Sequence, residues 1–512
     1  MRPGVTRKIF ALVVLGVWAA TVAIHVRREY FKPLALRLEE GARGIAPGSH
    51  VYVARMGEKA IGMATTRVDT VPTGFVLEDV LSLDVPALGR LHRSIATTHV
   101  ELGRALDLKT FRFSLQSEVG RFAVSGRATA DSLLELEIRA GGEPERGRVR
   151  LEPGLTVDAL VAPRLAAAGR LAVGEEATAR VFDPTVMEVR ETTLRVAAHD
   201  TLEVPDSVQW DAAAERWVPA HYDTVPAWQI EQRLDGLVVT SWVDEDGRLI
   251  RAESPLGFTL ERTEFELARQ EWRAARDDAA LAAGYGAIIE STAIASNAPL
   301  DSVEVRDRLR VRLLDVELEG LDLAGGRQAL SGDTLTVERE AAIEAGYRLP
   351  YRGGGEAAEE LAATPLVQSN DPRVVRVARR IAGDETDPAE VARRLNRWVY
   401  ARLEKDVVAS VPSAVQVLEA GKGDCNEHTV LYVALARALG LPARTAAGLV
   451  HVRGRFYYHA WPEVWLGGRW VAVDPTLGQF PADASHLRMV VGGLARQLEL
   501  VRLIGRLRLE VL

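Results

Sequence analysis

The 512-residue sequence contains one cysteine, Cys425. A single cysteine excludes an internal disulfide framework and any zinc site built from two or more thiolates. The sequence also has no excess of basic residues, because 63 Lys and Arg stand against 71 Asp and Glu and the formal net charge is -8. It therefore lacks the positive charge expected of a protein that binds nucleic acid or anionic lipid.

Long hydrophobic runs are confined to the N-terminus, where "IFALVVLGVWAATVAIHV" covers residues 9–26. This run has about the minimum length for a bilayer span, and basic residues flank it on both sides. We predict an uncleaved membrane anchor, because "TVAIHVRREY" is a poor signal-peptide cleavage site; a buried N-terminal helix is the alternative. The two basic flanks do not decide the orientation. We expect an extracytoplasmic, periplasmic body, since large C-terminal domains cross membranes largely regardless of local charge.

The rest of the composition is typical of a folded protein, with 47% hydrophobic and 26% charged residues. Between about residues 48 and 260 the pattern has a period of two. Phe111 and Phe113 flank Arg112, and "LLELEIR" at residues 133–139 alternates in the same way. Such alternation predicts strands with one solvated face. We expect an open antiparallel sheet that curves into a half-barrel.

One hairpin in this region has a strong turn signal, Asp246-Gly247, between two β-rich runs. The stretch "WVDEDGRLIRAESPLGFTL" loosely resembles the lipoprotein-carrier type of β half-barrel. That resemblance implies a sheet able to hold an apolar ligand, although packing of the sheet's own core explains the same pattern. Residues 264–286 then predict a helix and a connector, and residues 287–350 a second, smaller β region.

Beyond "YRGGGEAAEELAAT", a glycine-rich segment that predicts a linker, the period becomes helical. Asn370 or Asp371 precedes Pro372 as the N-cap of one helix. Asp387 precedes a second helix and has Glu390 three residues later, which is typical of a capping box. Two helices are therefore predicted at the start of the C-terminal region.

Cys425 lies at or just before the start of a third predicted helix. Glycines at 421 and 423 indicate a turn before it, and apolar residues recur at helical intervals from Val430 until Gly440 and Pro442. The N-terminus of a helix has unpaired N–H groups and a partial positive charge, which favour a thiolate. The neighbouring carboxylate of Asp424 would oppose ionisation of the thiol.

A β-hairpin follows, formed by "YYHAWPEVWL" and "RWVAVDP". A two-residue turn at 467–468 pairs Trp461 with Asp474. His459 and Asp474 then become diagonal neighbours on one face of the sheet. A carboxylate in that position could orient the imidazole towards a thiol.

These residues carry a resemblance. The stretch "GKGDCNEHTVLYVALARALGLPAR", followed by "HAWPEVWLGGRWVAVDPT", resembles the core of the transglutaminase-like, papain-related superfamily over about residues 370–488. The resemblance implies a Cys425, His459 and Asp474 triad on an α+β fold, with no metal or organic cofactor. It implies acyl transfer from an amide or peptide bond through a thioester. Water as the acceptor gives a protease or amidase, an amine gives a transglutaminase, and the sequence does not distinguish them.

Each member of the predicted triad also has an explanation without catalysis. A lone cysteine can be structural, His459 can be a strand residue with a satisfied hydrogen bond, and Asp474 can open the "DPT" turn. The alternative function is a catalytically silent, membrane-tethered scaffold or binding protein. Other polar and aromatic residues receive no firm role here: the histidines His428, His451 and His486, the helix-capping candidates Asn426 and Glu427, and Trp461, a core residue that could line the site.

The expected fold class is α+β, with a papain-like C-terminal core after antiparallel β-rich domains and an N-terminal transmembrane helix. The expected partners are a protein or peptide substrate of the cell envelope and the membrane itself. The predicted parts are a cytoplasmic tip and anchor (1–30), a β-rich domain with a helical connector (31–286), a small β region (287–350), a linker (351–369) and a transglutaminase-like domain (370–512).

Overall fold

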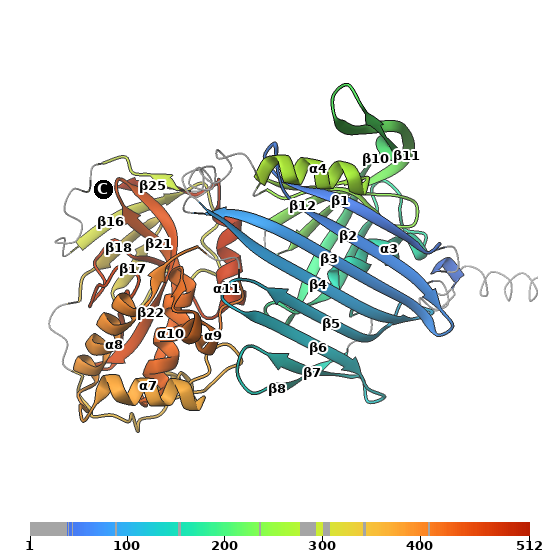
Figure 1. Ribbon diagram of the computed structural model, residues 1–512. Coiled ribbons are helices and arrows are strands. Elements are labelled where there is room, and N and C mark those ends of the chain that lie inside the picture. Colours follow the sequence, from blue (N-terminus) through green and yellow to red (C-terminus); the bar gives the residue numbers. More distant parts are fainter. Residues whose placement is uncertain are drawn as a thin grey trace, which may run out of the picture.

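The computed structural model describes residues 38, 40–42, 45–87, 90–151, 155–234, 237–255, 257–276, 293–298, 300, 308–340, 345–407 and 410–512. A large β-sheet and a mixed α/β C-terminal part lie side by side (Figure 1). The predicted anchor, residues 9–26, lies outside the described residues. None of the described helices is long and apolar enough to span a bilayer.

The described residues of the N-terminal half form one fourteen-stranded sheet in which neighbouring strands are antiparallel. Strands β1 and β14 pair near its middle. The chain runs outward from β1 to the edge strand β8 on one side, and then inward from the edge strand β9 to β14 on the other. The strands are β1 (Gly48–Met56), β2 (Lys59–Val71), β3 (Gly74–Ala87), β4 (Arg90–Gly103), β5 (Leu108–Gln116), β6 (Arg121–Ala128), β7 (Leu133–Arg139), β8 (Glu145–Arg150), β9 (Glu176–Asp183), β10 (Glu188–Asp211), β11 (Arg216–Leu234), β12 (Leu237–Val243), β13 (Leu249–Glu253) and β14 (Phe258–Thr263).

The sheet is curved. Phe111 of β5 and Phe182 of β9 contact each other with ring centroids 5.2 Å apart, although β9 is an edge strand far from β5 in the strand order. The two rings belong to one core, which the strands must close around. Phe111 and Phe113 are buried while Arg112 is exposed, so the predicted alternation and curvature are confirmed.

The predicted hairpin and helix at the end of the sheet are both present. Strands β12 and β13 meet through a turn in which Gly247 has a φ of +76°, a conformation that glycine adopts without strain. Helix α4 (Phe265–Arg276) follows β14 and packs on β1, β2 and β11 (Figure 1). The rest of the predicted connector, residues 277–286, lies outside the described residues.

The C-terminal part surrounds helix α10 (Cys425–Ala438), whose middle is buried on all sides. Helices α7 (Pro372–Ala382), α8 (Pro388–Arg402) and α9 (Ala414–Ala420) pack against it, together with strands β21 and β22. The sheet here has the order β15-β22-β21-β24, with β23 paired to β22. Its strands are β15 (Ile294–Ala295), β21 (Ala443–Val452), β22 (Arg455–Leu466), β23 (Arg469–Ala472) and β24 (Leu487–Val491).

Side-chain caps begin the helices where the sequence predicts them. Asp371 accepts a hydrogen bond from the backbone N–H of Arg373 at 2.8 Å, so Asp371 is the N-cap of α7. Asp387 accepts one from the N–H of Glu390 at 2.9 Å at the start of α8. Each cap satisfies one of the N–H groups that the first helical turn leaves unpaired.

The small β region is built together with the C-terminal part. Strands β16 (Arg308–Leu314), β17 (Gln328–Ser331) and β18 (Thr334–Glu338) form a sheet with β25 (Arg508–Val511), the last strand of the chain. Val311 pairs with Val511, and the two regions share one apolar core. The boundary proposed at residue 350 therefore does not separate two cores, because pairing between distant segments has no local sequence signal.

The segment predicted as a linker, residues 351–369, is also packed on this part. It contains helix α6 (Glu356–Glu359), and its acidic residues reach two arginines of the C-terminal part. Glu356 pairs with Arg444 and Glu360 pairs with Arg437. The glycines at 353–355 suggested a flexible hinge, but ion pairs with residues far along the chain hold the segment in place.

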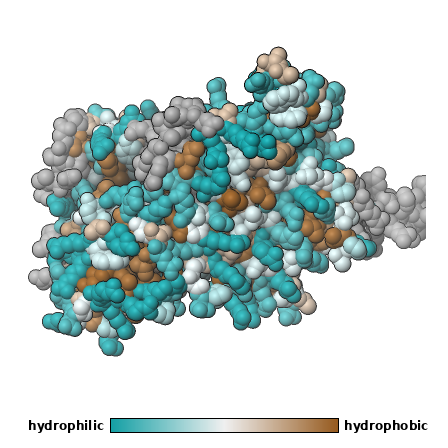
Figure 2. Space-filling view, in the orientation of Figure 1, coloured by the Kyte–Doolittle hydropathy of each residue, from teal (hydrophilic) through white to brown (hydrophobic). Residues whose placement is uncertain are grey.

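Turns at one end of the large sheet contact the C-terminal part. Ser413 donates a hydrogen bond from Oγ to the backbone oxygen of Ala140 at 2.6 Å. Lys422 Nζ lies 2.5 Å from Glu118 Oε2, and Lys422 is close in sequence to Cys425. On the face that Figure 2 shows, hydrophilic side chains separate the apolar patches.

Candidate active site

Cys425 is the first residue of α10, as the sequence predicts. Asp424 caps the helix by accepting a hydrogen bond from the N–H of Asn426 at 2.8 Å, and Glu427 Oε2 accepts one from the N–H of Asp424 at 2.9 Å. The Asp424 side chain also accepts from the backbone N–H of Glu427, and this bond together with the one from Asp424 N–H to Glu427 forms a capping box. A Cβ atom at residue 423 would lie 2.2 Å from the Cβ of Glu427, so Gly423 allows the chain to enter the helix at this angle.

Cys425 is partly buried, and it packs against an apolar cluster that includes Leu449 and Leu487. Burial raises the pKa of the thiol well above its usual range, and the negative charge of Asp424 acts in the same direction. A hydrogen bond from the backbone N–H of Ala460 acts against them. Burial thus outweighs the helix N-terminus, and the position of Cys425 alone does not produce the expected thiolate. A base is needed to take the proton.

Asp424 and Glu427 form an acid pair beside the thiol. Burial raises the pKa of Asp424 well above its usual value, and the negative charge of Glu427 and a hydrogen bond to it raise it further. Ser410 Oγ donates to Glu427 Oε1 at 2.7 Å. Asp424 is therefore harder to ionise than an exposed aspartate. Its carboxyl group thus opposes ionisation of the Cys425 thiol less than a fully charged carboxylate would.

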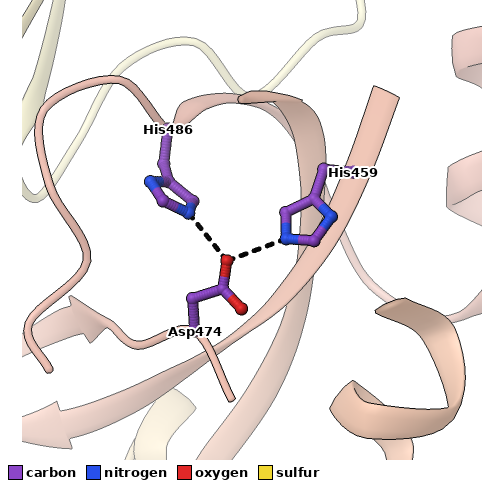
Figure 3. A group of neighbouring side chains, drawn as sticks. All are labelled: His459, Asp474 and His486. Carbon is purple, nitrogen blue, oxygen red and sulfur yellow. Dashed lines mark hydrogen bonds and ion pairs between the residues drawn. The ribbon is translucent and has the colours of Figure 1, made fainter. Parts of the chain in front are cut away.

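His459 and Asp474 meet as predicted, but the predicted pairing of Trp461 with Asp474 is not part of the ladder, because Asp474 pairs with Gln479. Strands β22 and β23 pair Leu466 with Arg469, and the regular ladder ends at Glu463 and Ala472. Just beyond it, His459 Nε2 lies 2.8 Å from Asp474 Oδ2. Because a carboxylate only accepts hydrogen bonds, His459 Nε2 carries a proton and donates it to this bond. Its second ring nitrogen, Nδ1, lies on the side away from Asp474 (Figure 3).

Asp474 is fully buried and accepts four hydrogen bonds. Its Oδ1 atom accepts from the N–H groups of Thr476 and Leu477 at 2.7 and 2.9 Å, and its Oδ2 atom accepts from His459 and His486. Burial alone would raise the pKa of Asp474. The positive charge and hydrogen bond of His459, together with those of His486, outweigh burial and hold the pKa far below its usual range.

His486, to which the sequence analysis assigns no firm role, is therefore part of the cluster. It is fully buried, and its Nε2 atom lies 2.9 Å from the same Asp474 oxygen that His459 contacts. Its Nδ1 atom lies 3.2 Å from Asp483 Oδ1. The two histidines flank the carboxylate from two sides (Figure 3). The only local signal was the three-residue spacing of Asp483 and His486, which does not reveal the contact with Asp474.

Trp461 packs on both histidines. Its ring is stacked with that of His459, with centroids 6.1 Å apart and an interplanar angle of 27°. It meets His486 edge-on at 5.1 Å. Trp461 is 1% exposed, so it is a core residue that also forms one wall of the histidine cluster. Of the other histidines, His428 places Nδ1 2.7 Å from the backbone oxygen of Asp424, and His451 lies against the ring of Phe456.

The cluster has ligand types that metals use, because ligand atoms of His459, Asp474 and His486 all lie within 4.8 Å of one another. Both histidines, however, point their Nε2 atoms at one carboxylate oxygen at hydrogen-bond distances. Protons between these atoms satisfy the arrangement. We assign no metal to it.

A second cluster with metal-ligand chemistry, His92, Glu118 and Asp406, lies where the sheet meets the C-terminal part. Lys422 Nζ lies 2.5 Å from Glu118 and 3.3 Å from Asp406. The ammonium group supplies the positive charge that these two carboxylates need. We assign no metal to this cluster either.

A cavity of about 220 Å³ lies beside the first two turns of α10. Asn426, Thr429 and Val430 line it from the helix, and Met187 lines it from the turn between β9 and β10. Thr429 is 1% exposed, and its hydroxyl has no hydrogen-bond partner within the described part of the chain. Both the sheet and the C-terminal part therefore form the walls of this cavity.

Comparison with known proteins identifies part of the chain. Residues 375–475 match the family model of the transglutaminase-like superfamily. An uncharacterized protein of Haemophilus influenzae is 35% identical over 96 residues, which are 18% of this chain and 26% of that protein. An uncharacterized protein of Mycobacterium leprae is 29% identical over 133 residues, 24% of this chain and 45% of that protein. The chain thus spans about a quarter of the length of the first relative and less than half of the length of the second.

Among solved structures, the chain is similar to the periplasmic domain of TgpA from Pseudomonas aeruginosa bound to ethylmercury. The TM-score is 0.24 and the sequence identity is 17%, with 36% of this chain and 76% of that chain covered. A β-barrel-like protein of a domain of unknown function from Brucella abortus gives a TM-score of 0.30 and 13% identity, with 43% and 94% covered.

Proposed function

We propose that this protein is a cysteine enzyme that transfers acyl groups from amide or peptide bonds, because residues 375–475 match the family model of the transglutaminase-like superfamily. The single observation that carries the proposal is the oriented His459–Asp474 pair, 2.8 Å apart, beside the helix that begins with Cys425. The thiol accepts a hydrogen bond from Ala460, the residue after His459. Nucleophile, base and orienting carboxylate thus come from adjacent elements.

In the proposed mechanism, Nδ1 of His459 takes the proton of the thiol because Nε2 already donates to Asp474. The sulfur of Cys425 bonds to the amide carbon, and the carbonyl electron pair moves to the oxygen. The backbone N–H of Cys425, the first residue of α10, can stabilise this oxyanion. The C–N bond then breaks, and His459 returns the proton to the leaving amine. Water or a second amine then attacks the thioester and restores the thiol.

The proposed substrate is a protein or peptide, and the cavity beside α10 supports this choice. Its lining is largely apolar, with Val430 and Met187 among its residues, and the unpaired hydroxyl of Thr429 offers one polar contact. Such a mixed surface suits a side chain of a peptide. We also propose that residues 9–26 anchor the protein and that its body lies outside the cytoplasm, where envelope proteins would be its substrates.

The test is alkylation of the full-length protein by iodoacetamide across pH, followed by mass spectrometry. Cys425 is the only cysteine, so every adduct reports this thiol. We expect Cys425 to react faster than free cysteine near neutral pH, although burial raises its pKa, because His459 accepts the proton. Cys425→Ala should form no adduct and keep its fold. A wild-type rate no greater than that of free cysteine at every pH would instead favour the silent scaffold.

A further inference from the structure

His486 is a buried cation. Each of its two ring nitrogens lies within hydrogen-bond distance of a carboxylate oxygen, 2.9 Å from Asp474 and 3.2 Å from Asp483. Since ionised carboxylates only accept hydrogen bonds, both nitrogens must carry protons, and the ring is an imidazolium. The two carboxylates are ionised: burial opposes this, but hydrogen bonds from His486 and its charge lower the pKa of Asp483 to about 2.

The pKa of His486 agrees with this geometry. Complete burial would lower it, but the hydrogen bonds and charges of Asp474 and Asp483 outweigh burial and raise it above the ordinary value. The surroundings also hold Asp483 in place. Arg327 donates to the backbone oxygens of Ala482 and Asp483 from the loop before β17, and Asp483 Oδ1 accepts from the N–H of Ser485 at 2.9 Å.

We infer that His486 is a positioning residue for the reaction proposed above: its imidazolium holds the Asp474 carboxylate towards His459 and offsets part of the negative charge that faces the Cys425–His459 pair. This inference rests on the proposed function. The rings of His459 and His486 lie 6.0 Å apart and share one oxygen of Asp474 as acceptor. A positive charge at that distance favours loss of protons from neighbouring groups.

The role is different from that of a core residue that only fills space. A space-filling residue affects how fast the site reacts, while a fixed charge affects the pH at which it becomes reactive. Several other charged or titratable groups surround the cluster and remain the same when only His486 is changed: His459 of β22, Cys425, Asp424, Glu427 and His428 of α10, and Arg327.

The experiment compares the pH midpoint of Cys425 alkylation in the wild type and in His486→Gln. The reagent is iodoacetamide, which is uncharged, so a change in the charge of the protein does not alter its approach to the thiol. Glutamine retains an N–H donor for Asp474 but removes the positive charge. We expect the midpoint to rise by on the order of one pH unit, because the variant removes the positive charge that shares Asp474 with His459. A lower rate with an unchanged midpoint would overturn the inference.

Asp483→Asn is the matched second variant. It removes a negative charge from the same cluster, and its amide oxygen can still accept the hydrogen bond from His486 Nδ1. The midpoint should therefore move down, opposite to His486→Gln. An unchanged or raised midpoint in folded Asp483→Asn would mean that the charges of this cluster do not set the midpoint. That result would overturn the inference, and it decides the question if His486→Gln fails to fold.

The two proposals fail in different ways. If wild-type Cys425 reacts no faster than free cysteine at any pH, the acyl-transfer function fails. If the wild type is reactive and has a measurable midpoint that neither variant moves, only the role of His486 fails. His486→Lys gives a further check, since it retains a positive charge and should keep a midpoint nearer to that of the wild type than His486→Gln does.

Discussion

The large sheet and the C-terminal domain place their charges differently. On the sheet, ion pairs such as Arg139–Glu137 and Arg67–Asp69 are largely exposed, with side chains 37–64% and 42–59% accessible. In the C-terminal domain, Glu463 is 2% exposed and contacts both Arg444 and Arg488. Asp474 is completely buried.

This difference follows from how each region is built. In a strand with one solvated face, every second side chain points towards solvent, so most charged side chains of the sheet remain hydrated. In the C-terminal domain, helices and strands enclose the hairpin that carries His459 and Asp474. A buried charge costs several kcal/mol unless a partner and hydrogen bonds compensate. Buried charge is therefore more frequent in the C-terminal domain, although Asp84 and Asp244 of the sheet are also buried beside arginines.

The largest effect should come from the base itself. His459→Ala should lower the rate of Cys425 alkylation at neutral pH by about 10²- to 10⁴-fold, because the thiol loses the group that takes its proton. Asp474→Asn should have a smaller effect on the rate, since the nucleophile and the base remain. Both rates are measured by quenching the alkylation reaction at timed intervals and quantifying the adduct by mass spectrometry.

The control for this comparison is His199→Ala on the sheet. His199 lies 4.6 Å from the ring of Trp228, much as His459 packs on Trp461, but it belongs to the long strand β10. Its replacement should leave the alkylation rate unchanged. A loss similar to that of His459→Ala would show that the assay reports general disruption of the protein.

The second effect concerns stability. Glu463→Gln should reduce the free energy of unfolding of the C-terminal domain by about 3–5 kcal/mol, because Arg444 and Arg488 would remain buried without their shared carboxylate. Urea denaturation followed by tryptophan fluorescence measures the change. In contrast, Glu137→Gln on the sheet should change stability by less than about 1 kcal/mol, as is usual for an exposed pair. Equal losses in the two variants would contradict the contrast between the two regions.

The smallest effect is a pH dependence within the buried cluster. The pKa of Asp483 is lowered to about 2, so its ionised form contributes about 2 kcal/mol of stability above the unfolded pKa of about 3.9. That contribution should be lost as the pH falls from about 4 to about 2. The difference in unfolding free energy between the wild type and Asp483→Asn should shrink over this range. A difference that stays constant down to pH 2 would mean that the carboxylate is not stabilised by its contacts.

For His486 the sign is the opposite. Its pKa is raised in the folded protein, so its contribution to stability is complete below the unfolded value of about 6.5 and is lost as the pH rises through the folded value. The stability difference between the wild type and His486→Gln should therefore be greatest in mildly acidic solution. The same denaturation series checks this.

Much of the candidate site could be predicted because its signals are local. Glycines and acidic residues around 421–427 indicate a helix start, and a capping box forms there through contacts within four residues. The turn at 467–468 fixes the register that brings His459 near Asp474. Strand alternation at Phe111 and Phe113 likewise depends only on the period of the backbone.

Other features could not be predicted because they depend on contacts between distant parts of the chain. His486 lies in an irregular stretch between β23 and β24, where no periodicity places its ring. Burial also decides the protonation of Cys425 and Asp424, and burial requires the surrounding elements to be assembled.

The sequence by itself determined where the helix, hairpin and strands of this protein begin and which three residues could act together, because caps, turns and side-chain periods act over a few residues. The tertiary structure alone decided three further features. The last strand pairs Val511 with Val311, the sheet curves until Phe111 meets Phe182, and His486 shares Asp474 with His459. Each of these three contacts joins residues that are far apart in the sequence, so forming it closes a long loop and costs conformational entropy. Only the combined burial of many side chains compensates for this entropy loss.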